Sequence, residues 1–215
     1  MALLEKCRGT WYSRRKVKFE KQRTLVLLKP DAVQRSLVGE ILKRIEQTGL
    51  KFVAFKFLLA KESQLVEHYH KDEKWFLEKG QRIMADRKLH GLAVEKDAVA
   101  YGKEIIDLIV KFMTAGPILA FVVEGNESVA VVKKIVGATE PKTSDVGTIR
   151  GDYTVDSYDH SSVQNRAVRN LVHCSESPEE AAREIAVWFK PEEIIDYKTI
   201  QERILYDVNL DGILE

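Results

Sequence analysis

The sequence predicts an α/β sandwich in which a four-stranded antiparallel sheet packs against helices in a split β-α-β arrangement. Two observations carry this prediction. First, short apolar runs alternate with segments whose apolar residues recur every three or four positions, in the order β-α-β-α-β-α-β-α. Second, the 215 residues are 45% hydrophobic and 31% charged, as in a globular protein with one large domain or one smaller domain with insertions. We expect the helices to cover one face of the sheet.

The first half of the chain supplies two predicted strands, each followed by a helix. Residues 23–29, Arg-Thr-Leu-Val-Leu-Leu-Lys, form an apolar run that Pro30 stops, which indicates a buried strand. Apolar residues at positions 38, 41, 42 and 45 then follow at helical spacing, and Gly49 ends that helix. The Phe-rich run over 50–60 predicts the second strand, and 62–70 predicts a helix.

The second half of the chain continues the alternation. The predicted elements are a helix with apolar residues at 105–113 that stops at Gly116-Pro117, a strand over 118–123, a helix over 129–136, a strand over 170–173 and a helix over 178–189. Gly137 ends the second of these helices, and Pro178 followed by two acidic residues opens the last. The fourth strand is therefore the shortest of the set.

Two polar segments, about 75–102 and 154–169, look inserted, because neither has enough apolar residues to fold as a separate domain. We therefore predict a basic arm over 1–22, one domain over 23–197 that carries both insertions, and a tail over 198–215. The tail includes Asp-Val-Asn-Leu-Asp-Gly, which begins like a calcium loop. No acid stands at the twelfth position of that loop, so a solvated tail is expected instead.

Charge and cysteine content disfavour several classes of protein. The formal net charge is +1, with a balance of +5 on residues 1–22 and therefore −4 on the rest. A nucleic-acid-binding role for the basic arm is a weak rival interpretation, since aromatic residues are not interleaved with the basic ones. No run approaches the roughly 20 apolar residues that span a bilayer, and no secretory signal is visible. Cys7 and Cys174 cannot build a disulfide framework, so we expect a reducing, cytoplasmic location.

Cations and one histidine are placed at predicted strand ends and turns. Lys29 ends the first strand, and Arg150 offers a bidentate fork from a turn that two glycines flank. Lys133 precedes that turn, and His173 ends the fourth strand beside the start of a helix. An imidazole is well suited to accept and pass on a charged group near neutral pH. The set predicts a phosphoryl-transfer site, and the chain has no Walker-type phosphate loop.

Four motifs give the chain a specific resemblance. They are K-P-D-A-V-Q-R from Lys29, G-A-T-E-P from Gly137, G-T-I-R-G-D from Gly147 and N-L-V-H-C-S-E-S from Asn170. In this order they resemble the nucleoside diphosphate kinase family, from about residue 23 to 197. The resemblance implies a ferredoxin-like α/β sandwich and an enzyme that moves the γ-phosphate of a nucleoside triphosphate to a nucleoside diphosphate. The transfer would be ping-pong and pass through a phosphohistidine.

The resemblance also implies roles for individual residues. His173 would be the nucleophile, and Glu184 on the following helix would hold the imidazole through its second nitrogen. The other site residues it implies are Tyr69 and Ser175 beside the histidine, Lys29 and Asn170 near the sugar hydroxyls and phosphates, Thr139 and Arg150 at phosphate oxygens, Lys133 where the family has Arg, and Trp75 or Phe76 stacked on the base. Mg²⁺ would bridge the nucleotide phosphates without protein ligands.

Assembly and the two insertions complete the expectations. Members of the family form homo-oligomers, so a hexamer or a tetramer is expected. Residues 75–102 should pack as a short helix and loop against the base-binding wall and reshape its rim. Residues 154–169 should lie outside, near a neighbouring subunit. The main rival interpretation is a non-catalytic nucleotide-binding or regulatory protein of the same fold.

Overall fold

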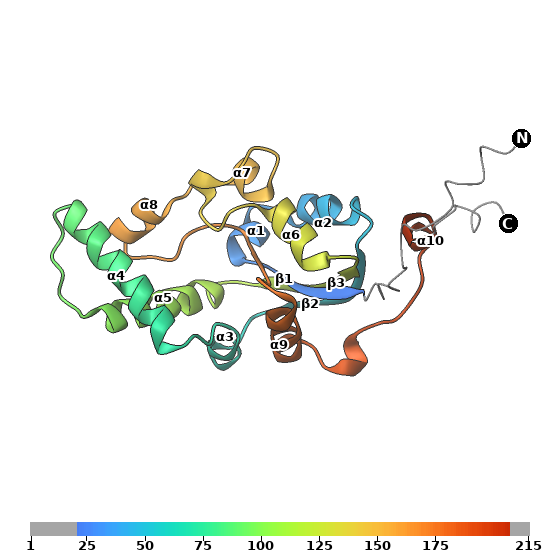
Figure 1. Ribbon diagram of the computed structural model, residues 1–215, viewed down its shortest axis with the longest axis horizontal. Helices are drawn as coiled ribbons and strands as arrows, with labels where there is room; N and C mark the ends of the chain where they lie inside the picture. Colours follow the sequence, from blue (N-terminus) through green and yellow to red (C-terminus); the bar gives the residue numbers. More distant parts are fainter. Residues whose placement is uncertain (1–20, 207–215) are drawn as a thin grey trace, which may run out of the picture.

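A single four-stranded antiparallel sheet lies at the centre of the protein, which we describe from a computed structural model over residues 21–206. The strand order is β2-β3-β1-β4 (Figure 1). The strands are β1 (Gln22–Leu28), β2 (Lys51–Leu58), β3 (Ile118–Gly125) and β4 (Val172–Cys174). All four strands predicted from the sequence are therefore present. The predicted antiparallel sheet is confirmed, and no strand end is shifted by more than two residues.

The helices follow the predicted alternation, with additional short elements. They are α1 (Pro30–Gln34), α2 (Val38–Glu46), α3 (Glu62–His68), α4 (Glu73–Leu89), α5 (Ala98–Met113), α6 (Ser128–Val136), α7 (Ile149–Tyr153), α8 (Tyr158–Val163), α9 (Pro178–Trp188) and α10 (Ile200–Tyr206), with 3₁₀ turns at Pro141–Thr143 and Pro191–Glu193. Among the described residues, no helix is both long and apolar enough to cross a membrane.

Helices cover both faces of the sheet, so the expectation of one covered face was wrong. Leu25 and Leu27 of β1 pack with residues of α3, α5 and α9, whereas Val26 and Leu28 pack with α1, α2 and α6. All four side chains are fully buried. A strand buried on both sides reads as a continuous apolar run rather than an alternating one. The run at 23–29 already carried that signal.

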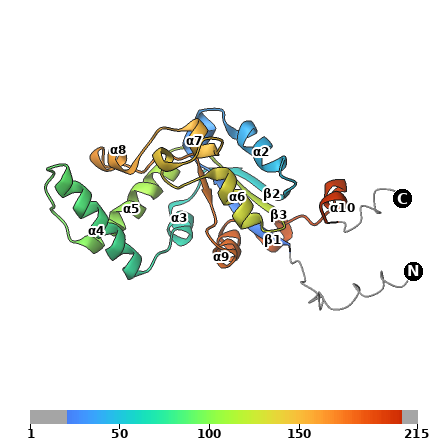
Figure 2. The same ribbon diagram turned by 45° about the horizontal axis from the view of Figure 1, so that its top comes forward.

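The segment over 75–102 forms most of a helical hairpin rather than a short helix and loop. The helix α4 has 17 residues and α5 has 16, and the two cross closely. A Cβ on Gly80 would lie 1.6 Å from the Ala98 carbonyl oxygen, and one on Gly102 would lie 2.1 Å from the Phe76 carbonyl oxygen. Only glycine therefore fits at these two positions. Figures 1 and 2 show the hairpin projecting away from the sheet, with α8 beside α4.

The segment over 154–169 does not lie outside the domain as expected. Asp156 is buried and pairs with the Arg166 guanidinium at 2.6 and 2.9 Å, and it also accepts from the Arg169 N–H. Burial opposes its charge, but these hydrogen bonds lower the pKa of Asp156 to about 2. A charged residue that looked solvated in the sequence thus organises the segment, which packs α8 against α4.

The predicted tail is described only in part. Its residues 200–206 form α10, and Glu202 lies 3.3 Å from the Lys51 ammonium, which also pairs with Glu124 at the end of the sheet. The basic arm, apart from residues 21 and 22, and the calcium-like hexapeptide lie outside the described residues.

Candidate active site

His173 is the middle residue of β4, the edge strand that pairs with β1. Its backbone is opposite Leu27 of β1, and its side chain is 18% exposed. Nε2 of the imidazole lies 3.1 Å from Oε2 of Glu184. A carboxylate accepts only, so Nε2 carries the proton and the lone pair is on Nδ1. Among residues 21–206 Nδ1 has no hydrogen-bond partner, so it is the nitrogen available for nucleophilic attack.

Glu184, which lies on α9, is held in place by its hydrogen-bond partners. The carboxylate is 2% exposed, and the Ser175 hydroxyl donates to the same Oε2 at 2.7 Å. Burial raises the pKa of Glu184, but the hydrogen bonds and charge of His173 and the Ser175 hydrogen bond outweigh it, so the pKa is lowered. Glu184 is thus ionised at neutral pH and oriented before substrate binds. Ser175 is fully buried behind this pair and acts on His173 through Glu184.

Two residues at the end of α3 pack directly on the His173 ring. The ring centroid of His68 lies 4.4 Å from that of His173, and the ring of Tyr69 lies 5.7 Å from it, both edge to face. Trp188 donates to Nδ1 of His68 at 3.2 Å, so the His68 proton is on Nε2. Burial, followed by the nearby His173, lowers the pKa of His68 well below its usual value. His68 is therefore a neutral support for the nucleophile.

Sequence reasoning named Tyr69 and missed His68. The role of His68 is revealed only by its contact with His173 in three dimensions. The sequence could not show this contact, because α3 and β4 are about a hundred positions apart in the chain. The Tyr69 hydroxyl and Nε2 of His68 are buried and have no hydrogen-bond partner among residues 21–206. Burial raises the pKa of Tyr69, so the phenol remains a donor.

A chain of hydrogen bonds places Lys29 at the end of β1. Its ammonium donates to Oδ1 of Asn170 at 2.6 Å, and Nδ2 of Asn170 donates to the Thr139 carbonyl at 2.8 Å. Desolvation, followed by the positive charge of Arg150, lowers the pKa of Lys29 to about 8. The structure therefore brings together three predicted binding residues from β1, the loop after α6 and the loop before β4.

Arg150 serves the protein backbone as well as the site. It is 6% exposed, and its guanidinium donates to the carbonyls of Asn170 at 3.2 Å, Gly137 at 2.9 Å and Val172 at 2.6 Å. Three of its five N–H groups are used in this way. Arg150 thus ties α7 to β4, which carries His173, and to the residues just before it, and only part of its fork remains for a ligand.

One cleft of about 500 Å³ joins these residues. Eight of the predicted site residues line it, namely Lys29, Tyr69, Trp75, Thr139, Arg150, Asn170, His173 and Glu184. Lys133, Phe76 and Ser175 do not line it. Lys133 is instead ion-paired with Glu176 at the surface, and Phe76 packs on Trp75. Of the two aromatic candidates, only Trp75 borders the cleft.

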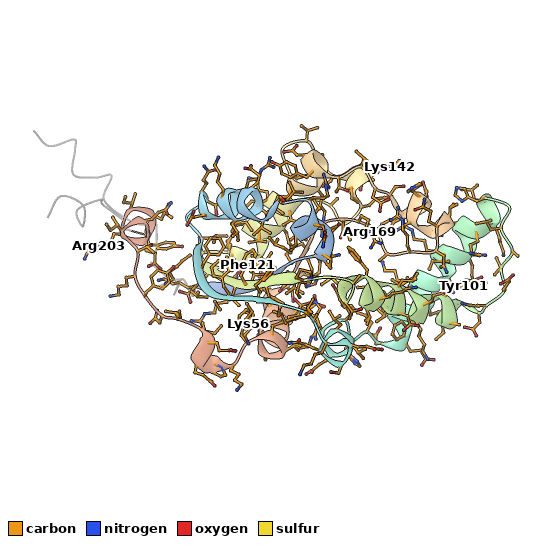
Figure 3. The ribbon with its side chains drawn as sticks, turned by 180° about the vertical axis from the view of Figure 1, so that it is seen from behind. Lys56, Tyr101, Phe121, Lys142, Arg169 and Arg203 are labelled. Carbon is orange, nitrogen blue, oxygen red and sulfur yellow. The ribbon has the colours of Figure 1, made fainter. Side chains whose placement is uncertain are left out.

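The cleft has two ends of different origin. Its catalytic end holds His173, Glu184, Tyr69 and Lys29, and its distal end is walled by α4, α5 and α8. Figure 3 shows the side chains of this helical arm, with Tyr101 labelled on α5, well apart from Phe121 in the sheet. Both segments that look inserted, 75–102 and 154–169, therefore contribute walls to the cleft. The sequence predicted such a position for 75–102 only.

Comparisons with known proteins agree on one family. The family model described as nucleoside diphosphate kinase matches residues 22–107 and 92–194. The nucleoside diphosphate kinase of Pyrobaculum aerophilum is 43% identical over 180 residues, which are 81% of this chain and 98% of the relative.

Two solved structures of such kinases are similar to this chain over most of its length. The NDP kinase crystal structure from P. aerophilum has a TM-score of 0.79 at 41% identity, and covers 82% of this chain and all of that chain. The transition-state mimic of the Borrelia burgdorferi kinase with bound vanadate and ADP has a TM-score of 0.70 at 36% identity. That match covers 86% of this chain and 96% of that one.

Proposed function

Because this chain belongs to the nucleoside diphosphate kinase family and transfers the γ-phosphate of a nucleoside triphosphate to a nucleoside diphosphate, we propose that His173 is the residue that carries the phosphoryl group. The observation that supports this role is the 3.1 Å pairing of Nε2 with Glu184, which leaves Nδ1 unpaired at the cleft. The transfer then proceeds in two half-reactions through one phosphohistidine.

In the first half-reaction, Nδ1 of His173 attacks the γ-phosphorus as the bond to the bridging oxygen breaks. The nucleoside diphosphate leaves with the electron pair of that bond. The imidazole keeps its Nε2 proton and gains positive charge, which the ionised Glu184 stabilises. In the second half-reaction, a β-phosphate oxygen of the acceptor diphosphate attacks the phosphohistidine and restores the neutral ring. No net proton is consumed.

The residues around His173 divide between the sugar, the phosphates and the base. Lys29 and Asn170 contact the sugar hydroxyls and neighbouring phosphates, and Tyr69 offers its buried hydroxyl to the transferred group. Thr139 and the remaining N–H groups of Arg150 bind phosphate oxygens. Trp75, which borders the cleft, stacks on the base in preference to Phe76. Lys133 can bind phosphate only after it leaves Glu176.

We assign Mg²⁺ to the nucleotide rather than to a protein site. His68, His173 and Glu184 have ligand atoms within 4.8 Å of one another, but Glu184 is already engaged by His173 and Ser175. Two imidazoles also suit Mg²⁺ poorly, since it prefers oxygen ligands and retained water. The donor set at the catalytic end therefore fits an ion carried by phosphate oxygens, whose charge it neutralises.

The edge strand β2 supports the proposal that the protein is a homo-oligomer, a hexamer or a tetramer. Its outer face and the residue just beyond it expose three large apolar side chains, Phe55 at 49%, Phe57 at 65% and Leu59 at 69%. An apolar edge strand of this kind pairs readily with another chain. We place the protein in the cytoplasm, because Cys174 is a free buried thiol suited to a reducing compartment.

Incubation with γ-labelled ATP, followed by removal of nucleotide, tests the catalytic assignment. Wild-type protein should retain label on the chain and release it to added nucleoside diphosphate, whereas His173→Ala should retain none while binding nucleotide nearly normally. His70→Ala, at an exposed histidine outside the cleft, is the matched control and should label normally. Label on the His173→Ala protein would refute the assignment. Absence of label on the wild type would favour the non-catalytic alternative.

A further inference from the structure

The catalytic end of the cleft has few cations free to meet a polyphosphate. Three N–H groups of Arg150 bond backbone carbonyls, and Lys133, which does not line the cleft, is paired with Glu176. Lys71 lines the cleft but lies 3.4 Å from Glu180. Lys29 is the exception: it donates to Asn170, but that partner is neutral and leaves the charge of the ammonium unpaired. A nucleoside triphosphate carries several negative charges, so further cations would be expected in the cleft walls.

Arg82 on α4 is an uncommitted cation in that wall. It lines the cleft, and among residues 21–206 it makes no hydrogen bond or ion pair. Its Cζ lies 5.1 Å from the ring centroid of Tyr158, the first residue of α8. Asp86, one helical turn away, forms no ion pair with it. The contact with an aromatic face holds the guanidinium plane while its N–H edges stay available.

Tyr158 is held in place from behind and faces the cleft. Its backbone N–H donates to Oε1 of Glu140 at 2.9 Å, and Ser157 caps the helix it begins. Its hydroxyl has no hydrogen-bond partner in the described part of the chain. Burial and Glu140 raise the pKa of the Tyr158 phenol, while Arg150 and Arg82 oppose that rise. Both guanidinium groups therefore lie within electrostatic reach of this one ring.

We propose that Arg82 and Tyr158, one from each inserted segment, bind the polyphosphate of the nucleotide across the mouth of the cleft. Arg82 donates its free N–H groups to non-bridging phosphate oxygens, and the Tyr158 hydroxyl donates to the same chain beside Arg150. The proposal rests on the cleft being the nucleotide site. It gives the two insertions a common purpose, because the contact that joins α4 to α8 also closes a ring of donors around the phosphates.

A phosphate contact and a base contact by Arg82 predict different substrate dependence. If Arg82 binds phosphate oxygens, its removal weakens binding equally for adenine, guanine and cytosine nucleotides. The size of that effect also falls as salt is added. If Arg82 binds a base edge, its removal instead changes the ratio of affinities for nucleotides with different bases. The KM values for several triphosphates and diphosphates therefore separate the two.

The test compares Arg82→Gln, Arg82→Lys and Tyr158→Phe with Lys88→Gln, an exposed residue of the same helix that does not line the cleft. Arg82→Gln should raise the KM for ATP roughly three- to twentyfold, as for loss of a charge-assisted hydrogen bond at a partly exposed site, with a smaller change in kcat. Arg82→Lys should recover part of the loss, and Tyr158→Phe should raise the KM by a few-fold.

Three outcomes would overturn the proposal. They are an unchanged KM in Arg82→Gln, a change confined to one base, and an equal change in Lys88→Gln. Circular dichroism and thermal unfolding of each variant exclude misfolding as the cause. Phosphoenzyme formation at saturating ATP should persist in Arg82→Gln, so a failed result at Arg82 and a failed assignment of His173 give different readouts.

Discussion

The two ends of the cleft are built on different principles. At the catalytic end, His173, Glu184 and Ser175 are buried or nearly so and bonded to one another before any substrate is present. At the distal end, Arg82 and Lys79 are exposed side chains on α4 that touch aromatic rings and form no ion pair among the described residues. The catalytic geometry is therefore fixed by folding, whereas the cations of the distal wall keep their charged groups available to a ligand.

This difference has an energetic consequence. A buried polar group without a partner costs about 1–3 kcal/mol, so a substitution at the catalytic end changes stability as well as activity. An exposed charge contributes little to stability, so a substitution at the distal end changes binding alone.

The largest effect is expected at Glu184. Glu184→Gln keeps the size of the side chain but removes the charge that stabilises the developing imidazolium, and its amide can turn a donor toward Nε2. By analogy with neutralising the carboxylate of a Ser-His-Asp triad, phosphoenzyme formation should slow roughly a hundred- to ten-thousandfold in rapid-quench measurements. Nucleotide affinity should stay near normal.

Ser175→Ala provides the graded control for the same contact. It removes one hydrogen bond to Oε2 and leaves the carboxylate charge in place, so the rate should fall by about tenfold or less. If Glu184→Gln were no slower than Ser175→Ala, the charge of Glu184 would not matter. The catalytic end would then depend on shape alone.

The next effect concerns Arg150, which we expect to act on stability and turnover together. Arg150→Ala leaves three buried or partly buried carbonyls without their donor, so unfolding free energy should fall by about 3 kcal/mol. Turnover should drop roughly ten- to a thousandfold. Urea unfolding and steady-state kinetics measure the two. A variant with normal stability and lost turnover would show that Arg150 serves only the ligand.

Local pattern was sufficient to predict most of the sheet and to single out His173, whose role as nucleophile remains a proposal. The apolar runs and their Pro and Gly boundaries predicted every strand. N-L-V-H predicted His173 at a strand end, whereas it is the middle residue of the short strand β4. The expectation of one covered face was wrong because the run at 23–29 is continuously apolar rather than alternating, which is the pattern of a strand buried on both faces. Its five residues from Thr24 to Leu28 are fully buried, which requires cover on both faces.

Long-range partners explain what the sequence could not show. The acceptors of Arg150 are backbone carbonyls, which carry no residue-type signal, so its structural role was invisible. Asp156 looked solvated because its partner Arg166 lies across a helix, and His68 has no motif that links it to His173. Composition alone also made residues 75–102 look too polar for the 17-residue helix α4, whose apolar contact is concentrated at a glycine-lined crossing with α5.

A pH dependence of intermediate size follows from Lys29. In the free protein its pKa is about 8, lowered by burial and by Arg150, so its charge is lost as the pH rises through that value. For nucleotide binding, kcat/KM should therefore fall by about tenfold per pH unit above 8. Bound phosphate favours the charged form, so kcat should fall only at higher pH. Lys29→Met should abolish this limb of the profile.

The lowered pKa of Lys29 has the opposite effect on the pH dependence of stability. The unfolded chain holds the Lys29 proton up to its ordinary pKa of 10.5, and the folded protein releases it at about 8. Between these values the unfolded state binds more protons, so stability rises with pH relative to Lys29→Met. Thermal unfolding at pH 7 and pH 10 for both proteins measures the difference. A flat difference would place Lys29 in a more solvated setting than the buried one described.

The smallest effect is expected at Lys133, which the resemblance assigned to a phosphate and the structure places outside the cleft. Its ion pair with Glu176 joins two side chains that are 41% and 61% exposed, and such pairs contribute about 0–1 kcal/mol. Lys133→Gln should therefore change stability by less than about 1 kcal/mol and the KM for ATP by less than about threefold. Lys133→Arg should be neutral or mildly beneficial, because a longer, planar fork can reach further toward the phosphates. A tenfold rise in KM for Lys133→Gln would mean that the pair with Glu176 opens when nucleotide binds. Cations that rearrange around the ligand would then be present at both ends of the cleft. Lys133 on α6 would belong to the adaptable part of the site rather than to the preformed part.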